Sequence, residues 1–104
     1  MFGTAATSIE HVPARLWESW RDENDAVVVD VREPMEWARG TLDGSKTISL
    51  MELPRAAQDL DKDTAVLLVC ATGARSTTAA AWLSSMGFTK VASMGGGVVA
   101  LGMA

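Results

Sequence analysis

Residues 65–76 read AVLLVCATGARS, an apolar run followed by a thiol, a glycine and an arginine. The run predicts a buried strand, because continuous aliphatic and β-branched residues are typical of strands covered on both faces. Cys70 ends this strand, and small residues then predict a tight loop in which Gly73 can adopt backbone angles closed to other residues. Such a loop can direct successive backbone N–H groups at one point. A thiol held there should ionise readily, so we predict that Cys70 is a nucleophile.

Strand-like and helix-like segments alternate along the rest of the chain. The expected strands are Ala26–Val31, Thr47–Ser49, Thr64–Val69 and Lys90–Ser93. The expected helices are Val12–Arg21, Glu33–Arg39, Leu50–Leu60, Ser76–Met86 and a final turn at Gly97–Leu101. This alternation predicts an α/β fold with a central parallel sheet of about five strands and helices on both faces. Ligands of such sheets bind beyond the carboxyl ends of the strands, where Cys70 lies.

The composition fits one ordinary folded domain over residues 1–104, with 48% hydrophobic and 21% charged residues. The net charge of −4 gives no reason to expect nucleic acid or an acidic membrane as a partner. One cysteine forms no internal disulfide, and neither a secretory signal nor a membrane-spanning run is apparent, so we expect a cytoplasmic location. No metal-ligand spacing or nucleotide motif is apparent, so we expect no metal and no cofactor.

The residues that follow Cys70 are predicted to bind its substrate. They are Ala71, Thr72, Gly73, Ala74, Arg75 and Ser76. Arg75 adds a fixed positive charge, and Ser76 is expected to cap the next helix through its hydroxyl. The start of that helix adds a partial positive charge, and each of these effects favours the thiolate. The alternative is an inert core cysteine, since free cysteines are often buried.

Four motifs in order resemble the single-domain rhodaneses, a family of sulfurtransferases. They are DVRE at 30–33, EWARGTLDGS at 36–45, CATGARS at 70–76 and GGVVAL at 96–101. The chain departs from the family pattern at Thr41, where histidine is frequent, and at Leu101, where tryptophan is frequent. These departures bear on local packing and leave the cysteine loop complete. The resemblance covers nearly the whole chain and implies a rhodanese-like fold.

The resemblance also implies a mechanism centred on Cys70. Its thiolate would take a sulfur from thiosulfate or a similar sulfane-sulfur donor and become a persulfide. A thiol, cyanide or a sulfur-acceptor protein would then remove that sulfur. Asp30 and Arg32 are expected to support the site, with Arg32 pairing an acidic side chain such as Glu36.

Two other functions remain open at this point. The protein could be a sulfur-relay or binding module with little turnover of small molecules, because a fold does not determine an activity. It could also be a cysteine-dependent phosphatase or arsenate reductase, families that also end a cysteine loop in arginine. Those families place five residues between the cysteine and the arginine, whereas four separate Cys70 from Arg75. The shorter loop favours a single sulfur over a tetrahedral oxyanion.

The remaining distinctive residues are predicted to have structural roles. The tryptophans are expected to anchor the core, and they are Trp17, Trp20, Trp37 and Trp82. His11, the only histidine, is expected to be solvated at the start of the first helix. Gly95–Gly97 is expected to be a simple turn before the last helical segment.

Overall fold

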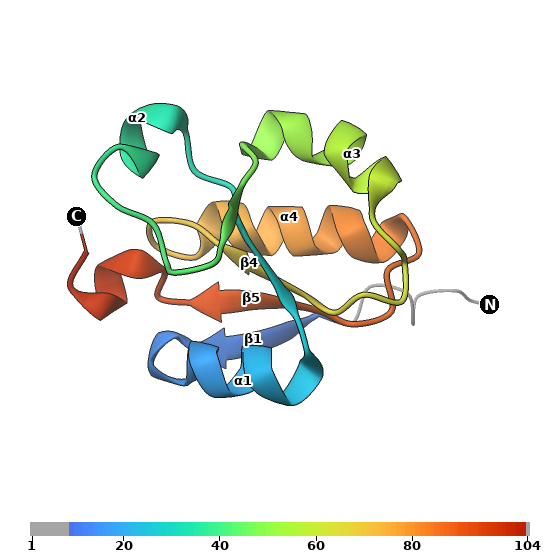
Figure 1. The fold of residues 1–104 in the computed structure, drawn as a ribbon, viewed down its shortest axis with the longest axis horizontal. Coiled ribbons are helices and arrows are strands. Elements are labelled where there is room, and N and C mark those ends of the chain that lie inside the picture. Colours follow the sequence, from blue (N-terminus) through green and yellow to red (C-terminus); the bar gives the residue numbers. More distant parts are fainter. Residues whose placement is uncertain (1–8, 104) are drawn as a thin grey trace.

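The computed structural model describes residues 9–103, which contain a five-stranded parallel sheet with the order β1-β5-β4-β2-β3 (Figure 1). The strands are β1 (Glu10–Pro13), β2 (Val27–Asp30), β3 (Lys46–Thr47), β4 (Val66–Val69) and β5 (Val91–Gly95). The helices are α1 (Trp17–Asn24), α2 (Pro34–Trp37), α3 (Leu53–Ala56) and α4 (Ala74–Ser85). Four 3₁₀ turns are η2 (Ala14–Leu16), η3 (Leu50–Glu52), η4 (Ala57–Asp59) and η5 (Val98–Leu101). The predicted α/β fold and its parallel sheet are confirmed.

Helices cover both faces of the sheet, and the alternation of side chains along β4 assigns each residue to one face. Leu67 and Val69 belong to the apolar cluster that includes the tryptophans of α1. Leu68 and Cys70 belong to the other cluster, which contains residues of α3 and α4. In Figure 1, α1 accordingly lies on one side of the sheet, and α3 and α4 lie on the other. The Cys70 side chain therefore faces α3 and α4.

The start of the chain differs from the prediction of a helix over Val12–Arg21. Val12 lies in the edge strand β1 and is paired in register with Met94 of β5. A 3₁₀ turn follows, and α1 then begins at Trp17. Pairing with β5 outweighs the helical spacing here, because short segments take their structure from tertiary contacts as much as from local preference. His11 is consequently an exposed residue of an edge strand rather than of a helix start.

The prediction of one continuous helix over Leu50–Leu60 is wrong. The structure divides this range into η3, α3 and η4, and only the four residues of α3 are α-helical. Pro54 lies in the first turn of α3, where its missing N–H and fixed φ allow a helix to begin but not to continue from η3. Leu53 and Ala57 are still fully buried, so the predicted apolar face packs on the sheet.

Two of the four tryptophans are core residues as predicted. Trp17 and Trp20 are each 8% exposed under β1 and β5. Trp37 and Trp82 are only half-buried, so the prediction for these two is wrong. On α4 the fully buried positions include the small residue Ala79, which lets the helix approach the sheet closely and leaves the larger Trp82 at the margin.

Within residues 9–103, no helix combines the length and the apolar character that crossing a membrane requires.

Candidate active site

Two backbone N–H groups and one hydroxyl surround the sulfur of Cys70, which follows β4 directly. The backbone N–H of Gly73 donates to Sγ at 3.1 Å, and the N–H of Ser76 donates to it at 3.3 Å. The Cys70 thiol itself donates to the Ser76 hydroxyl oxygen at 3.5 Å. Cys70 is only 1% exposed, so these groups replace water around the sulfur. The loop therefore surrounds the sulfur with inward-facing hydrogen-bond donors.

These contacts determine the ionisation of Cys70. Burial raises the pKa of the Cys70 thiol, since it removes water from the charged form. The Ser76 hydroxyl and the N–H groups of Ser76, Gly73 and Thr72 oppose this effect by hydrogen bonding to the thiolate. Together they outweigh burial, and the pKa of Cys70 lies below its ordinary value. The site thus favours the reactive form of the thiol.

Ser76 contributes from inside the helix rather than as its cap. α4 begins at Ala74, and its N-cap is Gly73, whose φ of +107° is open to glycine and unfavourable for other residues. Ser76 therefore lies in the first turn, where backbone N–H groups have no partner within the helix. One of these groups binds Sγ, so the predicted capping role of Ser76 is wrong while its place beside the sulfur is explained.

Arg75 forms a two-point ion pair with Glu36 of α2. Its Nη1 lies 2.7 Å from Oε1 and its Nη2 lies 2.9 Å from Oε2. The hydrogen bonds from Arg75 hold the pKa of Glu36 at about 2, although partial burial opposes that effect. The pair ties α2 to the cysteine loop across 39 residues of sequence. Both side chains remain about one-third exposed, with relative exposures of 35% for Arg75 and 30% for Glu36.

Arg32 pairs with Asp30 and not with Glu36, so that part of the sequence prediction is wrong. Its Nη2 lies 2.8 Å from Oδ2 of Asp30, and its Nε lies 3.1 Å from both carboxylate oxygens. The same Nη2 donates to the carbonyl of Gly40 at 2.7 Å. Asp30 and Arg32 are each 1% exposed. They connect the end of β2, beside β4, to the segment that follows α2.

The residues of the loop differ in how much they are exposed. Thr72 and Ala74 are exposed, whereas Ala71, Gly73 and Arg75 are half-buried and Ser76 is fully buried. The exposed rim is small and uncharged apart from Arg75. A small molecule that approaches the loop would therefore first meet Thr72, Ala74 and the partly exposed Arg75.

Gly97 contacts the back of this loop, and the sequence reading missed its importance. A Cβ at this position would overlap the carbonyl of Ala71 and come within 2.5 Å of the Thr72 nitrogen. The next two residues donate their N–H groups to the loop, Val98 to Cys70 O at 2.9 Å and Val99 to Ala71 O at 3.0 Å. Three consecutive glycines were the available signal, because glycine is typical where two backbones approach closely.

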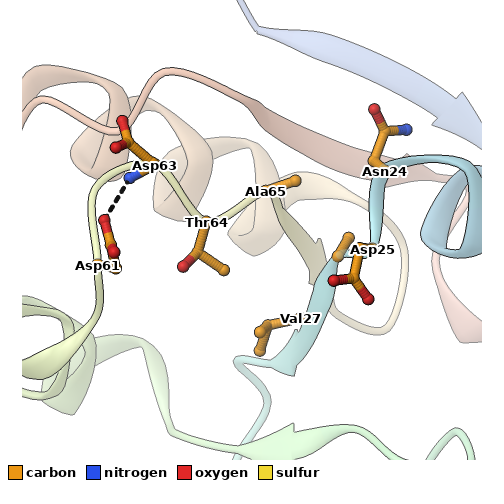
Figure 2. A pocket seen from close by; sticks show the side chains of 8 residues that line it. Asn24, Asp25, Val27, Asp61, Asp63, Thr64 and Ala65 are labelled. Carbon is orange, nitrogen blue, oxygen red and sulfur yellow. Dashed lines mark hydrogen bonds between the residues drawn. The ribbon is translucent and has the colours of Figure 1, made fainter.

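A second hollow lies at the opposite edge of the sheet, beside the amino ends of β2 and β4 (Figure 2). Its lining residues are Asn24, Asp25, Ala26, Val27, Asp61, Asp63, Thr64 and Ala65. Three of them are aspartates and none is basic, so this hollow does not suit an anionic substrate. Among residues 9–103, no group of three or more His, Cys, Asp or Glu side chains is arranged to hold a metal ion.

The geometry defines a class of protein: an α/β protein whose cysteine sulfur lies among backbone donors at the carboxyl ends of the strands of a parallel sheet. A family model described as the rhodanese-like domain matches residues 13–104. This chain belongs to the rhodanese-like domain family.

Individual relatives agree with this membership. The chain is 37% identical over 91 residues to a protein of Pseudomonas fluorescens named thiosulfate sulfurtransferase GlpE, covering 88% of this chain and 83% of that protein. It superimposes with a TM-score of 0.80 and 31% identity on a structure of reduced Bacillus anthracis CoADR-RHD, covering 90% of this chain but only 16% of that longer one. It also resembles a Rhodopseudomonas palustris protein of unknown function, described as a possible tyrosine phosphatase, with a TM-score of 0.75, 28% identity, and coverage of 96% and 86% of the two chains.

Proposed function

We propose that this protein is a sulfurtransferase that carries a sulfur atom on Cys70. The observation that carries the proposal is the convergence of the Gly73 N–H, the Ser76 N–H and the Ser76 hydroxyl on one buried sulfur. Donors arranged in this way stabilise a negative charge on the thiolate and on a persulfide that replaces it. The similarity to a thiosulfate sulfurtransferase supports the same assignment.

The proposed reaction has two displacements at sulfur. The Cys70 thiolate attacks the outer sulfur of thiosulfate or another sulfane-sulfur donor, a new Sγ–S bond forms, and the donor's S–S bond breaks. Sulfite leaves with the bonding electron pair when thiosulfate is the donor. A thiolate or cyanide then attacks the outer sulfur of the persulfide and regenerates the Cys70 thiolate. The products are a new persulfide or thiocyanate, and no further oxidant or cofactor is needed.

The loop Ala71–Ser76 is assigned to substrate binding in this proposal. Its exposed members, Thr72 and Ala74, are small, so a donor molecule would approach the loop without meeting a bulky side chain there. The Arg75 guanidinium is 35% exposed, so it can share its charge between Glu36 and an incoming anion. The buried pair of Asp30 and Arg32 is assigned to support, because it fixes the end of the strand beside β4.

Two alternatives predict different acceptors or substrates. A sulfur-relay protein would pass its sulfur to a protein thiol and react poorly with cyanide and small thiols. Since Cys70 is the only cysteine, any acceptor must be a separate molecule. A phosphatase would hydrolyse an aryl phosphate through Cys70, and the description of the Rhodopseudomonas palustris protein makes this worth measuring.

Intact mass after exposure to thiosulfate tests the proposal. The wild type should gain the mass of one sulfur atom, and subsequent cyanide should remove it and release thiocyanate. Cys70→Ala provides the matched control, because it removes the only thiol and changes a small buried side chain. The circular dichroism spectrum of this variant should match that of the wild type, as a check that it is folded. A wild type that gains no sulfur, or an alanine variant that gains it equally, refutes the proposal, and aryl phosphate hydrolysis that depends on Cys70 would favour the phosphatase.

A further inference from the structure

A cluster of buried hydroxyl groups lies behind the cysteine loop, and the proposed reaction does not account for all of it. Ser93 belongs to β5 and is fully buried. It is in register with Leu68 of β4, so its side chain points to the same face as Leu68 and Cys70, toward α4. Its Oγ lies 2.6 Å from the Oγ of Ser76 and 3.3 Å from the Oγ1 of Thr77.

The hydrogen bonds from Ser93 to Ser76 and to Thr77 can each run in either direction, and the number of protons limits the combinations. The Ser76 hydroxyl has one proton and three neighbouring acceptors: Cys70 Sγ at 3.5 Å, Gly73 O at 3.1 Å and Ser93 Oγ at 2.6 Å. The carbonyl of Gly73 already receives the Thr77 hydroxyl at 2.8 Å and the Thr77 N–H at 3.2 Å. If Ser93 donates to Ser76, the Ser76 proton is free to point at the sulfur.

We propose that Ser93 is a positioning residue: its hydrogen bond orients the Ser76 hydroxyl so that the Ser76 proton points to the sulfur of Cys70. With a thiolate or persulfide present, Ser93 donates to Ser76 and Ser76 donates to the sulfur. With a neutral thiol, both hydroxyls rotate, so that the S–H donates to Ser76 and Ser76 donates to Ser93. Deprotonation of the thiol releases the S–H proton to solvent, while both hydroxyls keep their protons and only rotate about their C–O bonds. Without Ser93, the Ser76 proton is drawn to the carbonyl of Gly73 and the sulfur loses a donor.

The charged groups around the sulfur are fixed independently of Ser93. Arg75 interacts electrostatically with Cys70 and is paired with Glu36 of α2. Asp30, in register with Val69 of the neighbouring strand, is paired with Arg32. α4 and β5 contribute the hydroxyls described above, and the other residues packed around Cys70 are uncharged, among them Leu53 of α3 and Ala79 of α4. Removing the Ser93 hydroxyl therefore leaves every one of these charges in place.

The rate of alkylation by iodoacetamide across a range of pH measures this effect, because only the thiolate reacts. For Ser93→Ala the midpoint of the profile should move to higher pH, with about a three- to tenfold loss of rate at pH values below the wild-type midpoint, the effect of one net hydrogen bond. Ser93→Thr keeps the hydroxyl and should retain most of the wild-type rate. Ser85→Ala is the control, because the Ser85 hydroxyl donates to the Trp82 carbonyl on the exposed side of α4, the helix that also contains Ser76.

A pair of isosteric variants separates the hydroxyl from packing. Ser93→Val and Ser93→Thr add the same volume, so Val should show the shifted midpoint and Thr should not, even if Ser93→Ala folds poorly. Equal midpoints for Val and Thr, or an unshifted Ser93→Ala, would overturn the proposal. Alkylation requires no sulfur donor, so this result is independent of whether the protein transfers sulfur.

Discussion

Replacing Gly97 with alanine tests how closely the segment after β5 supports the cysteine loop. The added methyl group would overlap the Ala71 carbonyl, which is backbone and has no side-chain freedom with which to move away. Gly97 also has φ +62° and ψ −170°, a combination that is essentially restricted to glycine. Backbone strain of this kind costs about 1–3 kcal/mol. Overpacking costs about 1–3 kcal/mol more, so the free energy of unfolding should fall by about 2–6 kcal/mol.

Thermal and urea denaturation followed by circular dichroism measure this loss. Gly102→Ala is the matched control, since Gly102 has φ +80° but no atom within 4 Å of an added Cβ. It should cost only about 1–2 kcal/mol for the left-handed backbone. In any folded fraction of Gly97→Ala the loop is displaced, and alkylation of Cys70 should require a higher pH. Equal stability of the two variants would refute the inferred contact between Gly97 and the loop.

Two further predictions concern the ion pairs. Arg32→Ala should lower the free energy of unfolding by about 3–5 kcal/mol, because it leaves Asp30 buried without its partner. Urea denaturation measures this loss, and a loss below about 1 kcal/mol would contradict the prediction. The pKa of Glu36 is lowered from 4.5 to about 2 in the folded protein, so its contribution is complete above about pH 4.5 and is lost as the pH falls toward 2. At neutral pH the wild type should be more stable than Glu36→Gln by about 1 kcal/mol, after allowance for solvent screening. This difference in the free energy of unfolding should vanish near pH 2. A difference that stays constant with pH would count against the ion pair.

Local sequence was sufficient for the central part of the fold. Continuous apolar runs predicted the buried strands β2 and β4. The small residues between Cys70 and Arg75 predicted the tight loop that follows β4. β1 was missed because four residues with one buried side chain carry little periodic signal. Its strand conformation depends on β5, which lies about 80 residues away in the sequence.

The site could be predicted only in part for a related reason. The cysteine loop is contiguous, so its N–H groups could be anticipated from Gly73 and the following helix. The ion pair of Glu36 with Arg75 and the contact of Ser93 with Ser76 join segments that are distant in the sequence. Such contacts depend on which strand lies beside β4 and on the register of the pairing. Neither the composition nor the spacing of residues contains that information.

The near-complete burial of Cys70 has a consequence for its chemical durability. Susceptibility to peroxide follows thiolate character and exposure, and at 1% exposure Sγ is as restricted to peroxides as it is to sulfur donors. In the proposed persulfide the added sulfur carries the negative charge, so an oxidant reacts with it before it reacts with Sγ. Damage would then fall on an atom that departs at the end of each cycle, while the cysteine beneath it is preserved.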